Sequence, residues 1–293
     1  MEQARHVLIL GCGFTGRRVA ARLIARGIRV IGTTRHPERL AELARTGLEV
    51  RRLEVLEPHT ILHALDDVPA DLRVVHSIPV VQGPQGWFDP TPRLLEALAG
   101  RFQRIVYLST TGVYGDAQHV DETTPPNPKH IKEKLRLDAE HAVANAGRSW
   151  LVLRCPAIYG PGRGVHRAMI EGRFRLLGDG SNWVSRIHVD DLAAHVVAGL
   201  FSDVIGAYPV GDDEPCRSRE IALFCAELLG LSLPQSAAAE ELHETRQSNR
   251  RVDGRAIRRL LGIELRFPTY RIGIPATLAA ERAGEDLMNL SDR

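Results

Sequence analysis

The chain has 293 residues, of which 44% are hydrophobic and 25% are charged, and its formal net charge is only +2. These values are typical of a globular protein with a buried core, and they give no reason to expect a nucleic-acid partner. The four cysteines form no C-x-x-C pair or disulfide framework, which favours a reducing compartment. No apolar stretch approaches the ~20 residues of a membrane-spanning helix, and nothing resembles a secretory signal. We therefore expect a cytoplasmic protein without a membrane partner.

Strand-like and helix-like stretches alternate through the first half of the chain. The expected strands cover residues 7–10, 29–34, 48–53, 74–80, 104–109 and 150–154. The expected helices cover residues 17–26, 37–46, 60–66, 91–99 and 129–146. Strand and helix repeated at this spacing are typical of an α/β fold, a doubly wound parallel sheet with helices on both faces.

The pattern loosens after residue 155, where glycine and proline interrupt residues 156–164 and 177–181. We expect residues 1–155 to form the sheet domain and residues 186–211 to return to it. Within the latter, Asp190 or Asp191 would cap a helix over residues 192–200. The remaining segments, residues 156–185 and 212–293, would form a smaller substrate-binding region.

The first expected strand runs directly into a G-x-G-x-x-G motif formed by Gly11, Gly13 and Gly16, and a helix follows. In such a loop the first glycine permits the tight turn and the second lets the backbone approach a pyrophosphate. The third lets the helix pack close to the strand. The helix N-terminus offers free N–H groups and a positive dipole end to the anion. An ordinary strand–helix turn could carry this pattern, but the strand before it and the helix after it favour a dinucleotide site of the Rossmann type.

The end of the second expected strand, at Thr34 and Arg35, bears on which dinucleotide the site prefers. An acidic residue usually binds the adenosine ribose hydroxyls there, and this strand end has none. An arginine can instead pair with a 2′-phosphate. Arg35, helped by Arg39 one helical turn further on, therefore favours NADP over NAD. Arg35 could also be an ordinary surface charge.

Further cofactor contacts should come from the carboxyl ends of other strands, where ligands of such sheets bind. The expected cofactor-binding residues are Gly11, Gly13, Phe14, Thr15, Gly16, Thr34, Arg35, Arg39, Ser77 and Pro156. The histidines are dispersed, and no His/Cys/Asp cluster has ligand spacing, so we predict no metal site.

Several longer motifs carry a family resemblance. They are V-Y-L-S-T-T-G-V-Y-G at 106–115, L-R-C-P-A-I-Y-G-P-G at 153–162, R-I-H-V-D-D at 186–191 and R-V-D at 251–253. With the glycine loop they make nearly the whole chain similar to extended short-chain dehydrogenases/reductases of the NAD(P)-dependent epimerase/dehydratase family, and most similar to atypical members of it. The resemblance implies an NADP-dependent epimerase, dehydratase or reductase acting on a sugar-like or nucleotide-linked small molecule. It also implies that Arg163 and Arg186 contact substrate phosphates, although both could be ordinary surface arginines.

The chemistry of this family uses a serine or threonine, a tyrosine, and a lysine four residues after the tyrosine. The tyrosine is the general acid/base, and the lysine lowers its pKa. The first position falls on Thr110. The tyrosine position falls on Lys132, with Arg136 four residues later, and no tyrosine stands between Tyr114 and Tyr159.

The missing tyrosine leaves several possibilities. Lys132 could act as the acid/base, because the neighbouring Arg136 would depress its pKa, and Arg136 could take over the ribose contact. A shifted alignment would instead place His130, which titrates near neutrality, at the tyrosine position with Lys134 four residues later. If all of these are surface charges, the chain would be a non-catalytic NADP-binding sensor or regulatory protein.

Relatives in this family often form dimers through two long helices. Helices 91–99 and 129–146 could form such a homodimer here, but packing against the sheet would explain their apolar faces equally well.

Overall fold

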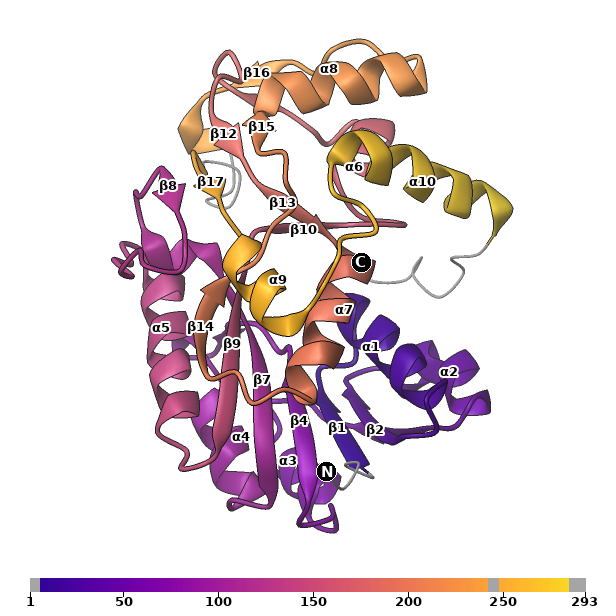
Figure 1. Cartoon of the computed structure of the whole chain (residues 1–293), viewed down its shortest axis with the longest axis vertical. Coiled ribbons are helices and arrows are strands. Elements are labelled where there is room, and N and C mark those ends of the chain that lie inside the picture. The colour runs from indigo at the N-terminus through magenta and orange to yellow at the C-terminus, as the bar shows by residue number, and fades with distance from the viewer. Residues whose placement is uncertain (1–5, 242–247, 285–293) are drawn as a thin grey trace.

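The computed structural model describes residues 6–241 and 248–284. Its centre is a parallel sheet with the strand order β14-β9-β7-β4-β1-β2-β3 (Figure 1). These strands are β1 (His6–Leu10), β2 (Arg29–Thr34), β3 (Leu48–Arg52), β4 (Leu72–His76), β7 (Phe102–Thr110), β9 (Ser149–Cys155) and β14 (Gly206–Pro209). Every neighbouring pair is parallel, so the predicted doubly wound α/β fold is confirmed.

Helices cover both faces of this sheet. They are α1 (Phe14–Ile24), η1 (Pro37–Leu40), α2 (Ala41–Arg45), α3 (Pro58–Leu65), α4 (Thr91–Leu98), α5 (Ile131–Ala144) and α7 (Val189–Leu200). Ile9 of β1 packs with the residues of α1 and α7 in one buried cluster. Leu8 and Leu10 belong to a second cluster with α3, α4 and α5. Alternate residues of one strand thus enter opposite cores, as expected for a sheet that is buried on both faces.

The fourth strand differs from its expected span of 74–80, since β4 ends at His76. Pro79 has no N–H to donate to a neighbouring strand. The chain instead folds into the antiparallel hairpin of β5 (Val81–Gly83) and β6 (Gly86–Phe88). This hairpin lies between β4 and α4 in the sequence, and its side chains reach the site described below.

The expected cap of the helix at 192–200 was wrong, because α7 begins at Val189. The N-cap is His188, whose Nδ1 accepts a hydrogen bond from the N–H of Asp190 at 3.2 Å. The Asp191 carboxylate instead accepts the backbone N–H groups of Arg266 and Phe267 at 2.8 and 3.0 Å. Its role is therefore to hold a distant segment of the chain against α7.

The remaining elements gather at one end of the sheet (Figure 1). The helical ones are η2 (Thr111–Tyr114), α6 (Val165–Ile170), α8 (Ser218–Leu229), η3 (Ala239–Glu241), α9 (Arg255–Leu261) and α10 (Tyr270–Ala283). The short strand pairs are β10 (Ala157–Tyr159) with β13 (Arg186–His188), β12 (Trp183–Val184) with β15 (Cys216–Arg217), β11 (Leu176–Leu177) with β16 (Ser236–Ala237), and β8 (His119–Val120) with β17 (Arg251–Val252).

Much of this end of the molecule shares a small core of its own, formed by residues of α6, α8 and α10 with Tyr159 and Cys216. Among the described helices, none is long and apolar enough to cross a membrane. The described residues also contain no group of three or more His, Cys, Asp or Glu side chains that could hold a metal ion.

Candidate functional site

The glycine loop leaves β1 through a turn that only glycine adopts without strain. Gly11 has a φ of +83°, in the region that side chains with a Cβ disfavour. Its N–H donates to Thr33 Oγ1 at 3.1 Å, and the Thr33 hydroxyl donates to the Ile9 carbonyl at 3.2 Å. Thr33 is buried in β2 and braces the turn. The sequence did not single it out, because nothing but its position near the end of a strand marks it.

The other two glycines of the loop are needed for space. A Cβ added at Gly13 would meet no atom within 4 Å, whereas one at Gly16 would lie 2.8 Å from the Gly11 carbonyl oxygen. Gly16 therefore lets α1 approach the turn, and Gly13 leaves its outer side open to a ligand. Helix α1 begins at Phe14 without a side-chain cap, so its first N–H groups lack partners within the helix. This cradle fits the pyrophosphate of a dinucleotide.

The carboxyl ends of β2 and β4 flank this cradle. Arg35, directly after β2, is exposed and has no ion-pair partner among the described residues. Glu38, the nearest acidic residue in the chain, pairs with His36 at 3.3 Å. On the other side, the Ser77 N–H donates to the Leu10 carbonyl at 2.9 Å and carries the pairing of β4 with β1 one residue further.

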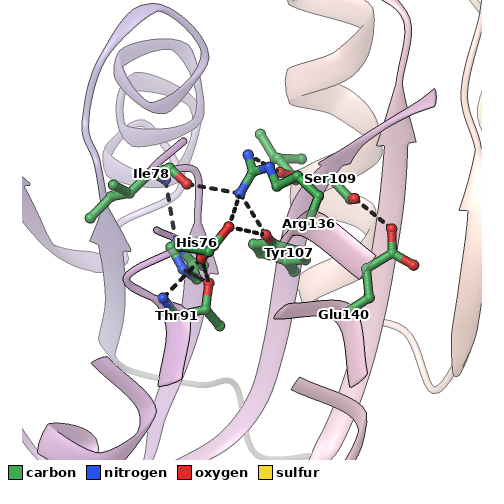
Figure 2. A network of polar contacts seen from close by, with 9 residues as sticks. His76, Ile78, Thr91, Tyr107, Ser109, Arg136 and Glu140 are labelled. Carbon is green, nitrogen blue, oxygen red and sulfur yellow. Dashed lines mark hydrogen bonds and ion pairs between the residues drawn. The ribbon is translucent and has the colours of Figure 1, made fainter. Parts of the chain in front are cut away.

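Arg136 of α5 points into the protein interior (Figure 2). Its Nη1 donates to the Ile78 carbonyl at 3.0 Å, to Asp89 Oδ2 at 3.1 Å and to the Tyr107 hydroxyl at 2.5 Å. Its Nη2 donates to the Leu108 carbonyl at 3.2 Å. Only 11% of this side chain is exposed, and 4% of that of Asp89. Arg136, which stands at the position of the family's lysine, therefore directs its guanidinium to hydrogen-bond acceptors inside the protein.

A chain of hydrogen bonds extends this network to His76 (Figure 2). Thr91 donates to Asp89 Oδ1 through both its N–H (2.9 Å) and its hydroxyl (2.5 Å). His76 Nε2 lies 2.8 Å from Thr91 Oγ1, and its Nδ1 accepts the Ile78 N–H at 3.3 Å. Burial lowers the pKa of His76 to about 3. The ring is thus neutral, with its proton on Nε2, and it donates to Thr91.

No sequence feature assigns His76, Asp89 or Tyr107 to this network. His76 and Tyr107 are buried residues of β4 and β7, and Asp89 follows a hairpin that the sequence did not predict. Burial raises the pKa of the Tyr107 phenol above its ordinary value, although the nearby Arg136 opposes the shift. The phenol stays protonated and donates to Asp89 at 3.2 Å. It is therefore a buried link of the network and is poorly suited to exchange protons with a ligand.

The other expected catalytic residues lie in different surroundings. Lys132 Nζ lies 4.2 Å from the centre of the Trp87 ring in the β5–β6 hairpin, a cation–π arrangement. His130 is exposed and caps α5, and its N–H donates to the Glu133 carboxylate at 3.1 Å. Thr110 Oγ1 accepts the Gly112 N–H at 3.1 Å, so its own hydroxyl proton can still be donated.

Ser109, next to Thr110 in the S-T-T motif, belongs to a separate buried network. Its hydroxyl donates to Glu140 at 2.5 Å, and Arg154 Nη2 donates to the same carboxylate at 2.7 Å. Figure 2 shows the Ser109–Glu140 contact turned away from the Arg136 side of β7. The Ser109 hydroxyl is therefore engaged inside the protein, whereas the Thr110 hydroxyl proton can still be donated to a substrate.

The two arginines expected to contact substrate phosphates have different surroundings. The Arg186 residue is only 4% exposed. It donates to Cys216 Sγ at 3.3 Å and lies over the Tyr270 ring at 5.0 Å. The Arg163 guanidinium carbon lies 5.2 Å from the centre of the Phe14 ring, at the glycine loop.

Pro156, one of the expected cofactor contacts, directly follows β9 and is half-buried.

Comparison with known proteins finds a matching family model and several similar proteins. A model of the NAD dependent epimerase/dehydratase family matches residues 7–206. The chain is 28% identical to the protein YeeZ of Escherichia coli (strain K12) over 90% of its own length and 97% of the relative. It is 30% identical to a 2-alkyl-3-oxoalkanoate reductase of Stenotrophomonas maltophilia (strain K279a) over 72% of its own length and 71% of that protein.

A solved structure agrees with these relatives. A conserved protein of unknown function from Silicibacter pomeroyi DSS is 33% identical, with a TM-score of 0.78 over 94% of this chain and 98% of the other. The expected family and its Rossmann-type fold are thus confirmed. The chain belongs to the NAD dependent epimerase/dehydratase family.

Proposed function

We propose that this protein is an NADP-dependent oxidoreductase of the epimerase/dehydratase or reductase type. Its substrate would be a hydroxyl or carbonyl compound that is sugar-like or nucleotide-linked. The observation that carries the proposal is the cradle between Gly11 and Gly16, whose open side at Gly13 would admit a pyrophosphate. When bound, the nicotinamide would supply a hydride donor or acceptor. The reductase relative supports the redox class.

The preference for NADP rests on the end of β2. The exposed Arg35 stands where the dinucleotide fold usually has a carboxylate. A guanidinium there can bind a 2′-phosphate through paired hydrogen bonds, whereas a carboxylate would repel it. Arg39 lies one helical turn further on and is half-buried.

The proposed roles at the reacting group divide between two side chains. The Thr110 hydroxyl would donate a hydrogen bond to the substrate oxygen, since it accepts the Gly112 N–H and its own proton is still available. The Lys132 ammonium, held beside Trp87, would hold or deliver the proton at that oxygen. Arg136 would be a positioning residue, because its guanidinium is engaged by Asp89, Tyr107 and backbone carbonyls.

Binding should be tested before turnover. NADPH at 100 times its Kd should raise the free energy of unfolding by about 2.7 kcal/mol. Turnover can then be followed as loss of NADPH with a 3-oxoalkanoate, whose carbonyl accepts hydride, and as formation of NADPH from NADP+ with UDP-glucose or UDP-glucuronic acid, whose hydroxyl-bearing carbons give it up. The absence of any NADPH-dependent stabilisation would refute the proposed cofactor site.

A matched pair of variants tests the catalytic assignment. Lys132→Ala should lower kcat by about 10²- to 10⁴-fold and leave the Kd for NADPH unchanged. Lys134→Ala changes an exposed lysine of the same helix and should leave both quantities unchanged. If NADPH binds but no substrate turns over and Lys132→Ala has no effect, the protein is an NADP-binding sensor and the catalytic proposal fails.

A further inference from the structure

A short segment after β10, residues 160–164, folds into a tight turn that we call the 160–164 strap. Gly160 and Arg163 exchange two backbone hydrogen bonds, each of 2.9 Å. Gly162 within the turn has a φ of +75°, which a residue with a side chain would adopt only with strain. The position of the Arg163 side chain is therefore set by a defined backbone.

The strap is held against the sheet domain at its first residue. A Cβ added at Gly160 would lie 2.5 Å from Val189 Cγ1 and 3.4 Å from Phe14 Cζ. Val189 is the first residue of α7, and Phe14 is the first residue of α1. The backbone of the strap thus packs directly against the helix whose N-terminus forms the dinucleotide cradle.

The C-terminal helix α10 holds the same strap from its other side. Glu281 Oε1 accepts the N–H of Gly162 at 2.6 Å and lies 3.3 Å from His166 Nε2. A carboxylate that accepts a backbone N–H makes a charge-assisted hydrogen bond, which is stronger than a neutral one. Helix α10 therefore holds the strap in place beside the first residues of α1 and α7.

These contacts bring the Arg163 guanidinium to the edge of the cradle. Its central carbon lies 5.2 Å from the centre of the Phe14 ring. Arg18, on the same ring at 4.8 Å, makes an ion pair with Asp190 at 3.2 Å. Arg163, from a segment distant in the sequence, therefore lies beside Phe14, the residue that directly follows Gly13.

We infer that Arg163 binds the pyrophosphate of the dinucleotide and that Glu281 is a positioning residue acting through the strap. The inference rests on the proposed NADP site. It gives Arg163 a different ligand from the substrate phosphate that the family resemblance implies. A guanidinium presents paired donors that match phosphate oxygens, and Arg163 lies beside Phe14, the first residue of α1, whose N–H groups would bind the same pyrophosphate.

The test measures binding without substrate, using three probes. NADPH and ADP-ribose carry the pyrophosphate, whereas adenosine 2′-monophosphate does not. Arg163→Ala should raise the Kd for NADPH and ADP-ribose by about 10- to 100-fold, the loss expected for a hydrogen bond to a charged group. It should leave the Kd for adenosine 2′-monophosphate unchanged. Arg163→Lys, which keeps the charge but loses the paired donors, should fall between. Arg175→Ala, an exposed arginine of the same region, is the control.

The outcomes separate the inference from the proposed function. If the unaltered protein binds NADPH and Arg163→Ala leaves that Kd unchanged, the inference is overturned and the proposed function stands. If Arg163→Ala raises the KM for the substrate and leaves the Kd for NADPH unchanged, Arg163 binds the substrate and the inference is overturned. If the unaltered protein binds neither NADPH nor ADP-ribose, the proposed cofactor site itself fails.

A double-mutant cycle tests the part played by Glu281. Glu281→Ala should raise the Kd for NADPH severalfold in the unaltered protein and should have no further effect in the Arg163→Ala background. A merely structural role would lower the free energy of unfolding in both backgrounds without this dependence on Arg163. Equal effects on the Kd in the two backgrounds would show that Glu281 does not act through Arg163.

Discussion

Arg136 Nη1 donates to Asp89 Oδ2 at 3.1 Å, and the two side chains form an ion pair that is almost wholly withdrawn from solvent. The pair joins α5 to the segment that follows the β5–β6 hairpin. Because the guanidinium also donates to the Ile78 and Leu108 carbonyls, it links α5 to the ends of β4 and β7 beside the cofactor cradle. In the family, a lysine at this helix position holds the cofactor. Here Arg136 instead joins segments of the protein to one another.

Removing the carboxylate should leave a buried charge without its counter-ion. We expect Asp89→Ala to lower the free energy of unfolding by about 3–5 kcal/mol, the cost of breaking a buried ion pair from one side. Chemical denaturation would measure it. Asp138→Ala, at an exposed position of α5, should cost less than about 0.5 kcal/mol. If Asp89→Ala lowers the free energy of unfolding no more than Asp138→Ala does, the Arg136–Asp89 ion pair does not stabilise the fold.

Two alanine substitutions in the glycine loop should affect different properties, the first the stability of the fold and the second the binding of NADPH. Gly16→Ala should lower the free energy of unfolding by about 1–3 kcal/mol, because its Cβ would lie 2.8 Å from the Gly11 carbonyl oxygen. Gly13→Ala should fold normally, since its Cβ meets no atom within 4 Å, but should weaken NADPH binding by filling the cradle. Thermal unfolding and NADPH titration of both variants would decide. Equal NADPH affinity in Gly13→Ala would count against this placement of the pyrophosphate.

The choice between the two dinucleotides should depend on Arg35. Arg35→Ala should raise the Kd for NADPH by about 10- to 100-fold, the loss expected for a hydrogen bond to a charged group, and should leave the Kd for NADH nearly unchanged. Titration of both dinucleotides would show the difference. Arg45→Ala, at an exposed position of α2, serves as the control. A parallel loss of affinity for both dinucleotides would show that Arg35 does not read the 2′-phosphate.

The buried neutral His76 should make stability depend on pH. Its folded-state pKa is about 3, against an ordinary value of 6.5, so between these values the unfolded chain binds a proton that the folded protein does not. The free energy of unfolding should therefore fall as the pH drops below about 6.5, by about 1.4 kcal/mol per pH unit from this residue. His76→Gln should flatten the curve between about pH 6 and pH 4 by that slope. His141→Gln, at an exposed position, is the control, and an unchanged slope in His76→Gln would contradict the prediction.

Most of the sheet could be predicted because its signals are local. Apolar runs of strand length and amphipathic runs of helix length placed β1, β2, β3, β7 and β9 to within two residues of their observed ends. Prediction failed where a distant group decides the local conformation. The start of α7 is an example, since the Asp191 carboxylate is taken by Arg266, 75 residues away in the chain.

The candidate site was predictable only in part. The three glycines could be assigned separate roles because each role follows from the missing Cβ at its place in the motif. The surroundings of Lys132 could not be predicted, since Trp87 reaches it from a hairpin without a motif of its own. The roles of Thr33, Asp89 and Tyr107 could not be predicted, because each acts through a partner that only folding brings near.

The sequence by itself determined the α/β order of elements, the glycine loop and the family, because these depend on spacing over a few residues. Only the tertiary structure decided what the long charged side chains bind. Arg136 meets Asp89 across 47 residues, and Gly162 meets Glu281 across 119. A guanidinium is stabilised by whichever acceptors the fold brings within reach of its long, flexible stem, and residue spacing along the chain does not specify those acceptors.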